Sequence, residues 1–496
     1  MAAAGEFALP ETTIADIHAA FRAGALTARA LVESYLDRIE AYDRNGPAIN
    51  SIVSVNPAAL DDAARLDAAF ERDGPVGKLH GIPVIVKDQA DVAGMPTTMG
   101  SVLFRDHHPG RDCFVASRLR QAGAILIAKS TLGEMGAGDT HGSLFGSTRN
   151  VYDLDRTAGG SSGGSGAAVS ANFAAVAIGQ EGFASIRRPA AWNGVVGMRP
   201  TAGLVSRGGV YAGWPMINGS LGPMCRTVAD AARLLDVMVG YDPADPVTAR
   251  GVGQVPESYA AGLDADGLKG ARIGILRQPM GFASEPESGD FARVDAVFSR
   301  AVEDLAACGA DIVDPVSVPD LVELLATRVN DRAEEDASFR EYVSGLADPP
   351  FSSRDEAMAS PLFAETSRGV RVRWAADAGA EAHRAFLAAR ERLMTNLLAV
   401  MADHRLDAIV HKAVEHQPTL IEDGVNPPFV DQKGAPWLNT FVIFVPSIVV
   451  PGGFTSDGLP AGITFLGRGY DDARMIRYAH AYEQATRHRR PPASAP

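Results

Sequence analysis

The sequence predicts an α/β protein in which the strands of a central sheet are covered by helices on both faces. Short apolar runs at 82–86, 124–128, 174–178 and 272–276 (IPVIV, AILIA, AAVAI and RIGIL) alternate with helical stretches. A strand that is apolar at every position is typical of burial on both sides, because a strand with one solvent face alternates apolar and polar residues. No internal repeat is visible in the chain.

Residues 1–75 are expected to form N-terminal helices. Thr13 and Asp16 have the spacing of a capping box, and Gly24 is placed to end the helix that follows it. Thr27 is placed to start a second helix. Its apolar face would be formed by Leu31, Tyr35, Leu36 and Ile39.

Residues from about 320 to 405 differ from the predicted core (76–315 and 406–490), because they are charged, rich in alanine and helical in pattern. We expect a helical excursion from the core. It is either a lid or interface, or a surface helical pair with no role in chemistry. After it, 441–453 (FVIFVPSIVVPGG) are expected to return as buried strand and turn, and 470–488 to form an amphipathic closing helix.

The composition fits a folded protein with a large core, since 46% of the 496 residues are hydrophobic and 21% are charged. The net charge of −14 argues against nucleic acid as a main partner, because such partners select a basic surface. A short basic segment at 487–492 (RHRRPP) is more simply a solvated tail.

Neither a signal peptide for export nor a membrane-spanning segment is expected from the sequence. The N-terminus (MAAAGEFALPETT) has no Lys or Arg before its weakly apolar part, and no apolar run approaches the roughly 18 residues of a membrane span. Cys113, Cys225 and Cys308 are too few and too scattered for a disulfide framework or a zinc site. We therefore expect a cytoplasmic protein with reduced, mostly buried thiols.

The stretch at 156–168 (RTAGGSSGGSGAA) is the most unusual in the chain, and three interpretations of it are disfavoured. A linker would join segments of different composition, and this stretch does not. A phosphate-binding P-loop needs Lys where Ser165 and Gly166 stand. A G-x-S-x-G nucleophile elbow needs an apolar strand directly before it, and the preceding residues (NVYDLDRTA) are polar.

A fourth interpretation uses two further segments. Lys87 ends an apolar run, GGSSGG follows at 159–164, and 177–206 read AIGQEGFASIRRPAAWNGVVGMRPTAGLVS. Together they resemble the amidase signature family of Ser-Ser-Lys hydrolases. Its motifs read roughly GGSSGG, then G-[ST]-D-x-G-G-S-[IV]-R-x-P-A, then C-G-x-x-G-x-K-P-T. Family-like segments also occur at 141–150, 222–242 and 458–486.

The resemblance implies one amidase signature domain over 1–496, with a central mixed β-sheet covered by helices on both faces and a helical insertion at 320–405. It implies that Ser185 is the nucleophile, that Ser161 is a bridging serine at a cis peptide bond, and that Lys87 is the base. A serine hydroxyl is a weak nucleophile until a base accepts its proton. Burial of Lys87 after an apolar strand would lower the pKa of its amine into a useful range.

The resemblance also places backbone donors and substrate contacts. The N–H groups that would stabilise an oxyanion come from Gly182, Phe183, Ala184 and Ser185. Substrate contacts are expected from Met135, Gly136 and Gly160.

This chain departs from the family pattern around the oxyanion loop. Phe183 and Ala184 stand where the family has two glycines, which puts the fit of the acyl group in question. Glu181 replaces the usual Asp and is expected to pair with Arg187. Trp192 and Trp437 could shape the pocket, as could Phe183, but each is individually better explained as core.

No metal and no cofactor are expected. His411, Glu415 and His416 do not follow the H-E-x-x-H order of a zinc site, and the resemblance places their segment beside the pocket.

The expected function is hydrolysis of a small-molecule carboxamide at a carbon–nitrogen bond other than a peptide bond. Related alternatives are carbamate (urethane), ester and hydrazide hydrolysis by the same three residues. An amidotransferase A-type subunit, which would require partner chains and glutamine, is a further alternative. A binding protein without activity is disfavoured, because Lys87, Ser161 and Ser185 are all present. No nucleic acid or membrane partner is expected, and a homodimer is left open.

Overall fold

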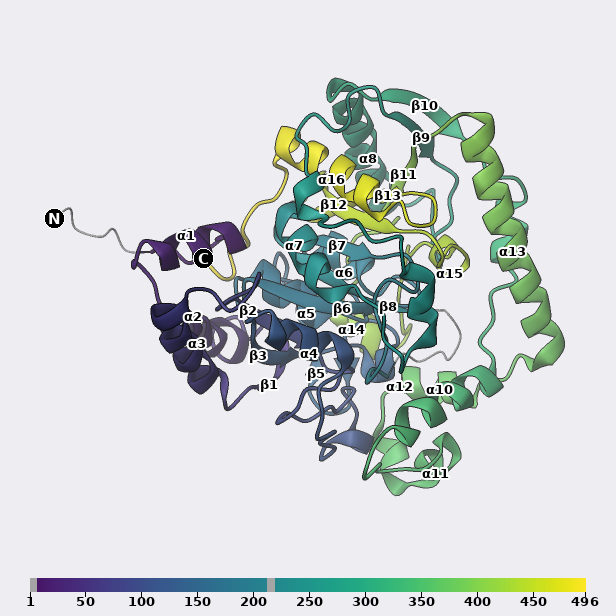
Figure 1. Cartoon of the computed structure of the whole chain (residues 1–496). Helices are drawn as coiled ribbons and strands as arrows, with labels where there is room; N and C mark the ends of the chain where they lie inside the picture. Colours follow the sequence, from purple (N-terminus) through teal and green to yellow (C-terminus); the bar gives the residue numbers. More distant parts are fainter. Residues whose placement is uncertain (1–6, 212–218) are drawn as a thin grey trace.

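The computed structural model describes residues 7–211 and 219–496. One mixed sheet of 11 strands runs through the molecule, in the order β1-β3-β2-β6-β8-β7-β12-β13-β11-β9-β10 (Figure 1). A separate pair, β4-β5, forms a small hairpin. The strands, in chain order, are β1 (Ile52–Val55), β2 (Pro83–Lys87), β3 (Ile125–Ser130), β4 (His141–Gly142), β5 (Gly146–Ser147), β6 (Val176–Glu181), β7 (Val196–Arg199), β8 (Ser220–Cys225), β9 (Arg272–Leu276), β10 (Asp311–Val316), β11 (Ala408–Lys412), β12 (Ser447–Phe454) and β13 (Pro460–Leu466).

Helices surround this sheet. In chain order they are α1 (Ile14–Arg22), α2 (Ala28–Arg38), α3 (Ala59–Asp73), α4 (Phe114–Gln121), α5 (Gly163–Ser170), α6 (Arg187–Trp192), α7 (Val228–Met238), α8 (Gly289–Ala307), α9 (Leu321–Leu325), α10 (Arg332–Ser344), α11 (Arg354–Ala359), α12 (Arg368–Ala375), α13 (Gly379–Asp403), α14 (Ile421–Val425), α15 (Leu438–Phe441) and α16 (Asp472–Thr486). No helix of the described chain is long and apolar enough to cross a membrane.

Strand β13 shows why both faces of the sheet need helices. Successive residues of a strand point to opposite faces. A Cβ added to Gly462 would lie 3.2 Å from the side chain of Ala191 in α6. Phe465, on the opposite face, packs edge-on against Tyr482 of α16 with ring centroids 6.2 Å apart. The expected α/β fold, with helices on both faces of a mixed sheet, is confirmed.

The strands that carry the site are parallel. β2 pairs with β3 on one side and with β6 on the other, both in parallel. Lys87, the last residue of β2, lies opposite Ser130, the last residue of β3. Because parallel strands end at the same edge of a sheet, Lys87 emerges beside the loop that follows Glu181 at the end of β6.

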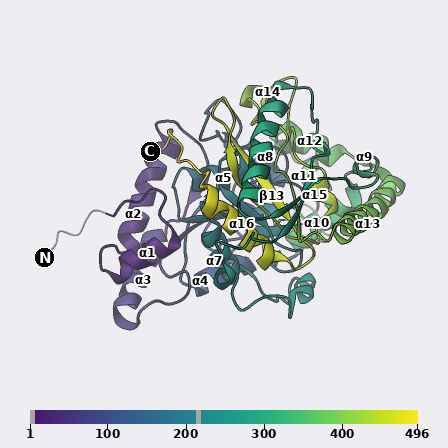
Figure 2. The same ribbon diagram turned by 90° about the horizontal axis from the view of Figure 1, so that it is seen from above.

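The ends of the molecule are occupied by different segments (Figures 1 and 2). Helices α1–α3 lie at one end, and α9–α13 of the helical excursion lie at the other. The excursion packs inward through an apolar cluster that joins Phe339 and Trp374 to Phe104 and Met135 of the core. The segment at 320–405 therefore contacts the same part of the core as the predicted substrate residue Met135.

Most of the predicted elements are confirmed. Thr13 caps α1 with its side chain and forms a full capping box with Asp16, and Thr27 caps α2. The four apolar runs fall on β2, β3, β6 and β9, and the closing helix is α16. The cysteines are free, with Cys113 and Cys225 buried and Cys308 partly exposed.

Two expectations need correction. The strand expected from 441 begins only at Ser447, because Pro446 has no N–H to donate to a sheet ladder. The buried guanidinium of Arg199 also donates to the carbonyl of Val442 (2.6 Å), which keeps that carbonyl out of strand pairing. The N-terminal part is not purely helical either, since it contributes the edge strand β1, which pairs antiparallel with β3.

Candidate active site

The Lys87 amine is the centre of the candidate site. It is fully buried, and its Nζ lies 2.7 Å from the Ser161 Oγ and 3.4 Å from the carbonyl oxygen of Gln180. Burial lowers the pKa of Lys87 well below its ordinary value, and the charge of Glu181 opposes this only in part. A buried amine of this kind is neutral over a wider pH range than a surface lysine and can accept a proton.

The Gly/Ser stretch is a tightly packed loop that leads into the buried helix α5. A Cβ added to Gly160 would lie 2.3 Å from the carbonyl oxygen of Gly138. A Cβ on Gly164 would lie 2.3 Å from the Thr131 hydroxyl. Only glycine fits at such distances, so the stretch is a packed part of the core and not a flexible linker. The Gly160–Ser161 peptide bond is cis, as the resemblance implied.

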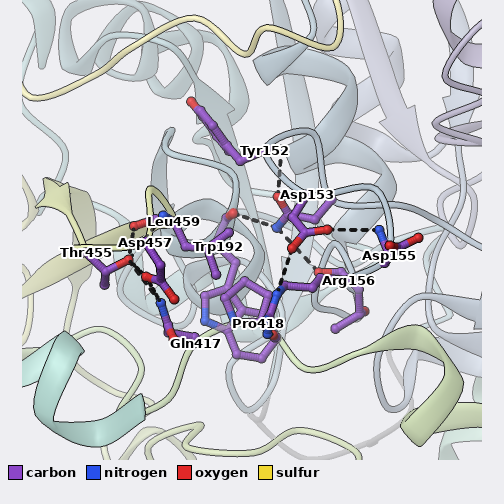
Figure 3. A network of polar contacts seen from close by, with 12 residues as sticks. Tyr152, Asp153, Asp155, Arg156, Trp192, Gln417, Pro418, Thr455, Asp457 and Leu459 are labelled. Carbon is purple, nitrogen blue, oxygen red and sulfur yellow. Dashed lines mark hydrogen bonds and ion pairs between the residues drawn. The ribbon is translucent and has the colours of Figure 1, made fainter. Parts of the chain in front are cut away.

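The approach to this loop is anchored by polar contacts from distant segments (Figure 3). Arg156 donates to the carbonyl oxygen of Pro418 over 2.6 Å. Trp192 is buried, and its indole N–H donates to the carbonyl of His416. Within the described residues, no strand directly precedes Gly159. The nucleophile-elbow interpretation therefore fails, and Trp192 is a core residue.

Ser185 lies beside the Gly/Ser loop. It is more exposed than the three residues that precede it in the loop between β6 and α6. The N–H of Ser162 donates to the Ser185 carbonyl at 3.0 Å, which ties the two loops together. Ser185 is half-buried, whereas Gly182, Phe183 and Ala184 before it are buried. Across the described chain, no hydrogen bond joins the hydroxyls of Ser161 and Ser185. The structure thus brings Lys87 to Ser161 and places Ser185 next to them, leaving the last contact to the proposal below.

The loop between β6 and α6 presents free backbone donors. The N–H groups of residues 182 to 185 donate no hydrogen bond within the described residues. The loop is held from behind by the Glu181 carboxylate. It accepts from the N–H groups of Ile186 (2.8 Å) and Arg187 (2.9 Å) and from the Arg187 side chain (2.8 Å). The predicted Glu181–Arg187 pair is confirmed.

The charge state of Glu181 follows from this environment. Burial raises the pKa of its carboxyl. The charges of Arg187 and Arg199 and the Arg187 hydrogen bonds outweigh that effect, so the pKa is lowered overall. Glu181 is therefore ionised, with Arg199 as a more distant ion-pair partner at 3.8 Å.

Comparison with known proteins gives one consistent result. The amidase family model matches residues 30–476. The chain belongs to the amidase family. It is 32% identical to a probable amidase of Arabidopsis thaliana, over 98% of this chain and 92% of that protein. It is 33% identical to the A-type subunit of the glutamyl-tRNA(Gln) amidotransferase of Gloeobacter violaceus, over 98% of this chain and 99% of that protein.

A solved structure supports the same assignment. The native peptide amidase of Stenotrophomonas maltophilia superposes with a TM-score of 0.86 and 35% identity, covering 98% of this chain and 99% of that one. The amidase family's fold therefore extends over nearly the whole chain.

The predicted substrate contacts lie in segments that adjoin Ser161, since the N–H of Gly133 donates to the Ser161 carbonyl (2.9 Å). Met135 and Gly136 lie in a short turn (Glu134–Gly136) in which both have positive φ (55° and 75°), and a Cβ on Gly136 would lie 3.6 Å from the side chain of Gln89. The carbonyl of Met135 accepts from Arg373 of α12 (3.0 Å). The helical excursion therefore helps to hold this turn, which sequence reasoning did not predict. The third predicted contact, Gly160, directly precedes Ser161.

Arg188 is a structural residue of the site that sequence reasoning missed. Its guanidinium donates to the carbonyl of Gly160 (2.8 Å) and pairs with Asp139 (2.9 Å). Arg188 therefore fixes the peptide that carries Ser161. The family motif R-x-P-A leaves this position free, so the sequence carried no signal for it. A cavity of 130 Å³ on the Asp139 side is lined by neither Lys87 nor Ser161.

The segment with His411, Glu415 and His416 has a structural role. The Glu415 carboxylate accepts from the N–H groups of Met280 (2.8 Å) and Gly281 (2.9 Å). Within the described residues no group of three His, Cys, Asp or Glu side chains is arranged to hold a metal ion.

Replacing Glu181 tests how the oxyanion loop is held. Glu181→Gln should lower the free energy of unfolding by about 3–5 kcal/mol, because it leaves buried arginines without their carboxylate. The pKa of Glu181 is lowered by folding, so its stabilisation is present above the unfolded pKa and is lost as pH falls through the folded pKa. Urea denaturation at neutral and acidic pH measures both effects.

The matched control is Glu33→Gln, which removes an exposed pair with Arg29 on one helix. It should change the free energy of unfolding by only about 0.5 kcal/mol. Equal losses in the two variants at neutral pH would contradict the structural role of Glu181.

Proposed function

We propose that this chain is an amidase that hydrolyses a small-molecule carboxamide to an acid and an amine through an acyl-enzyme. The observation that carries the proposal is the 2.7 Å contact between the buried Lys87 amine and the Ser161 hydroxyl, beside Ser185. Lys129, near the end of the neighbouring strand β3, is also buried but pairs with Asp88 (3.1 Å). Lys87 has no carboxylate within ion-pair distance in the described residues, which favours the neutral amine that can accept a proton.

Acylation begins when neutral Lys87 takes the proton of the Ser161 hydroxyl while Ser161 takes that of Ser185. The Ser185 Oγ then forms a bond to the carbonyl carbon, and the carbonyl oxygen becomes an oxyanion. The free N–H groups of residues 182 to 185 are the donors available to it, and one such donor is worth about 10²–10³ in rate. Collapse breaks the C–N bond, and the proton held by Lys87 returns through Ser161 to the departing amine.

Deacylation follows the same route in reverse. Water gives a proton through Ser161 to Lys87 and attacks the acyl carbon. The Ser185 oxygen leaves and recovers a proton, which restores the resting site. The three side chains, the backbone donors and water supply every group that these proposed steps use.

Two other functions remain candidates. Carbamates, esters and hydrazides react through the same acyl-enzyme, and Phe183 in place of glycine favours an altered acyl or leaving group. A role as an amidotransferase subunit is favoured by the 33% identity to such a protein. It requires partner chains and glutamine, so co-purification and glutamine-dependent activity distinguish it. Peptide amides belong in the substrate panel, because a peptide amidase is among the similar structures.

Replacing Ser185 tests the nucleophile. Ser185→Ala should lower kcat/KM for an aryl amide by about 10⁴–10⁶-fold, as loss of the nucleophile does in other serine hydrolases. It should also abolish covalent labelling by a fluorophosphonate probe, measured by intact mass. Ser34→Ala, in an exposed position of α2, should keep both.

Labelling of Ser185→Ala at wild-type level would remove Ser185 from its role. Equal kcat/KM for matched aryl amides and aryl carbamates would remove the preference for amides.

Replacing Lys87 tests the base. In the wild type, activity should rise with pH as Lys87 becomes neutral. The midpoint of this rise should lie at a pH below the ordinary pKa of lysine, because burial lowers the pKa of Lys87. Lys87→Met keeps the buried volume, and it should lower activity and flatten this rise. Lys78→Met, at an exposed position, should keep the wild-type profile, and a wild-type profile for Lys87→Met would assign the proton to another base.

A further inference from the structure

Arg328 of the helical excursion reaches the oxyanion loop. It lies in the connection between α9 and α10. Its guanidinium carbon is 4.6 Å from the ring centroid of Phe183 and 5.6 Å from that of Trp437. Phe183 is two residues before Ser185 in the chain, so this cation is held over the loop that carries the proposed nucleophile and oxyanion donors.

Arg328 has no acidic partner within the described chain. Its Nε donates to the Thr440 hydroxyl at 3.1 Å, and its two terminal nitrogens make no hydrogen bond there. Other arginines of the site differ, because Arg187 pairs with Glu181 and Arg188 pairs with Asp139. A half-buried cation placed beside a reaction centre, with its outer donors unused, is suited to an anion that arrives with the substrate.

The environment of Arg328 fixes the direction of its donors. Phe183 and Trp437 form an aromatic platform with Ala184 and Ala435, and Phe282 stacks on Trp437 with centroids 5.6 Å apart. Stacking on an aromatic face orients the planar guanidinium, whose outer edge can then bind a carboxylate through two parallel hydrogen bonds.

The platform also gives a reason for the unusual loop sequence. Phe183 stands where the family motif has glycine, and glycine would offer no ring for the guanidinium. Burial lowers the pKa of Arg328 to about 10, so the side chain keeps its charge at neutral pH. The Arg328 guanidinium is therefore held in place by the same side chain, Phe183, that departs from the family motif.

We propose that Arg328 is a specificity-determining residue that binds a carboxylate group carried by the amide substrate. The inference rests on the proposed amidase function and adds to it a substrate class, namely amides with a carboxylate close to the scissile bond. Arg328 acts here in binding and takes no part in the proton transfers.

The test compares matched anionic and neutral amides. One pair, the 4-nitroanilides of glutaric acid and of valeric acid, places the carboxylate on the acyl side. A second pair, 4-acetamidobenzoate and acetanilide, places it on the amine side. The wild type should prefer the anionic member of at least one pair by about 10–100-fold in kcat/KM. Arg328→Gln should lose that preference, with a loss of kcat/KM at least about ten times larger on the anionic member than on the neutral member, and Arg328→Lys should keep part of the preference.

A matched control is Arg277→Gln. Arg277 stacks on Phe298 (5.4 Å) and pairs with Asp314, at the far edge of the sheet between β9 and β10. This variant should keep the wild-type preference, which shows that loss of a stacked arginine alone does not change selectivity. Equal losses on anionic and neutral amides in Arg328→Gln, or no anionic preference in the wild type, would overturn the proposal.

Failure of the amidase function gives a different result. If the wild type hydrolyses no amide, the role of Arg328 is still measured by the rate of fluorophosphonate labelling at Ser185. Benzoate should slow that labelling in the wild type and not in Arg328→Gln, while benzamide should affect both proteins alike. Equal effects of benzoate on the two proteins would contradict carboxylate binding.

Discussion

The contact between the buried Lys87 amine and the Ser161 hydroxyl is the constraint on which the rest of the site depends. A charged ammonium at this depth would lose its hydration without gaining a free carboxylate, since Glu181 is already shared by Arg187 and Arg199. Burial therefore favours the neutral amine. The surrounding sheet keeps Lys87 away from water, because Lys87 ends a strand with parallel neighbours on both sides.

The surroundings of Ser161 explain why its sequence is so rich in glycine. The loop approaches Thr131 and Gly138 more closely than any side chain would allow. Arg188 then holds the peptide before Ser161, and the N–H of Gly133 donates to the Ser161 carbonyl (2.9 Å). Close packing and hydrogen bonds thus fix the Ser161 hydroxyl in front of the Lys87 amine, so this part of the proposed proton relay is formed before a substrate arrives.

The features that could be predicted from the sequence are those that depend on local patterns of residues. Apolar runs predicted the strands, and the motifs predicted the candidate site around Lys87. Each run and each motif is a short stretch of consecutive residues. Contacts between distant segments left no such signal. The bond from Arg373 to Met135 and the stacking of Arg328 on Phe183 depend on how the excursion folds back. A run such as 441–446 was predicted as strand from its hydrophobicity, but Pro446 and buried polar contacts decide its conformation.

The most direct test of this account is the ionisation of Lys87 itself. With ¹³C-labelled lysine, the Lys87 Cε signal can be assigned by its loss in Lys87→Met and followed by NMR from neutral to alkaline pH. We expect a transition below the ordinary pKa of lysine, parallel to the rise in activity. A Lys87 amine that stays charged up to the ordinary pKa, in an active protein, would contradict it.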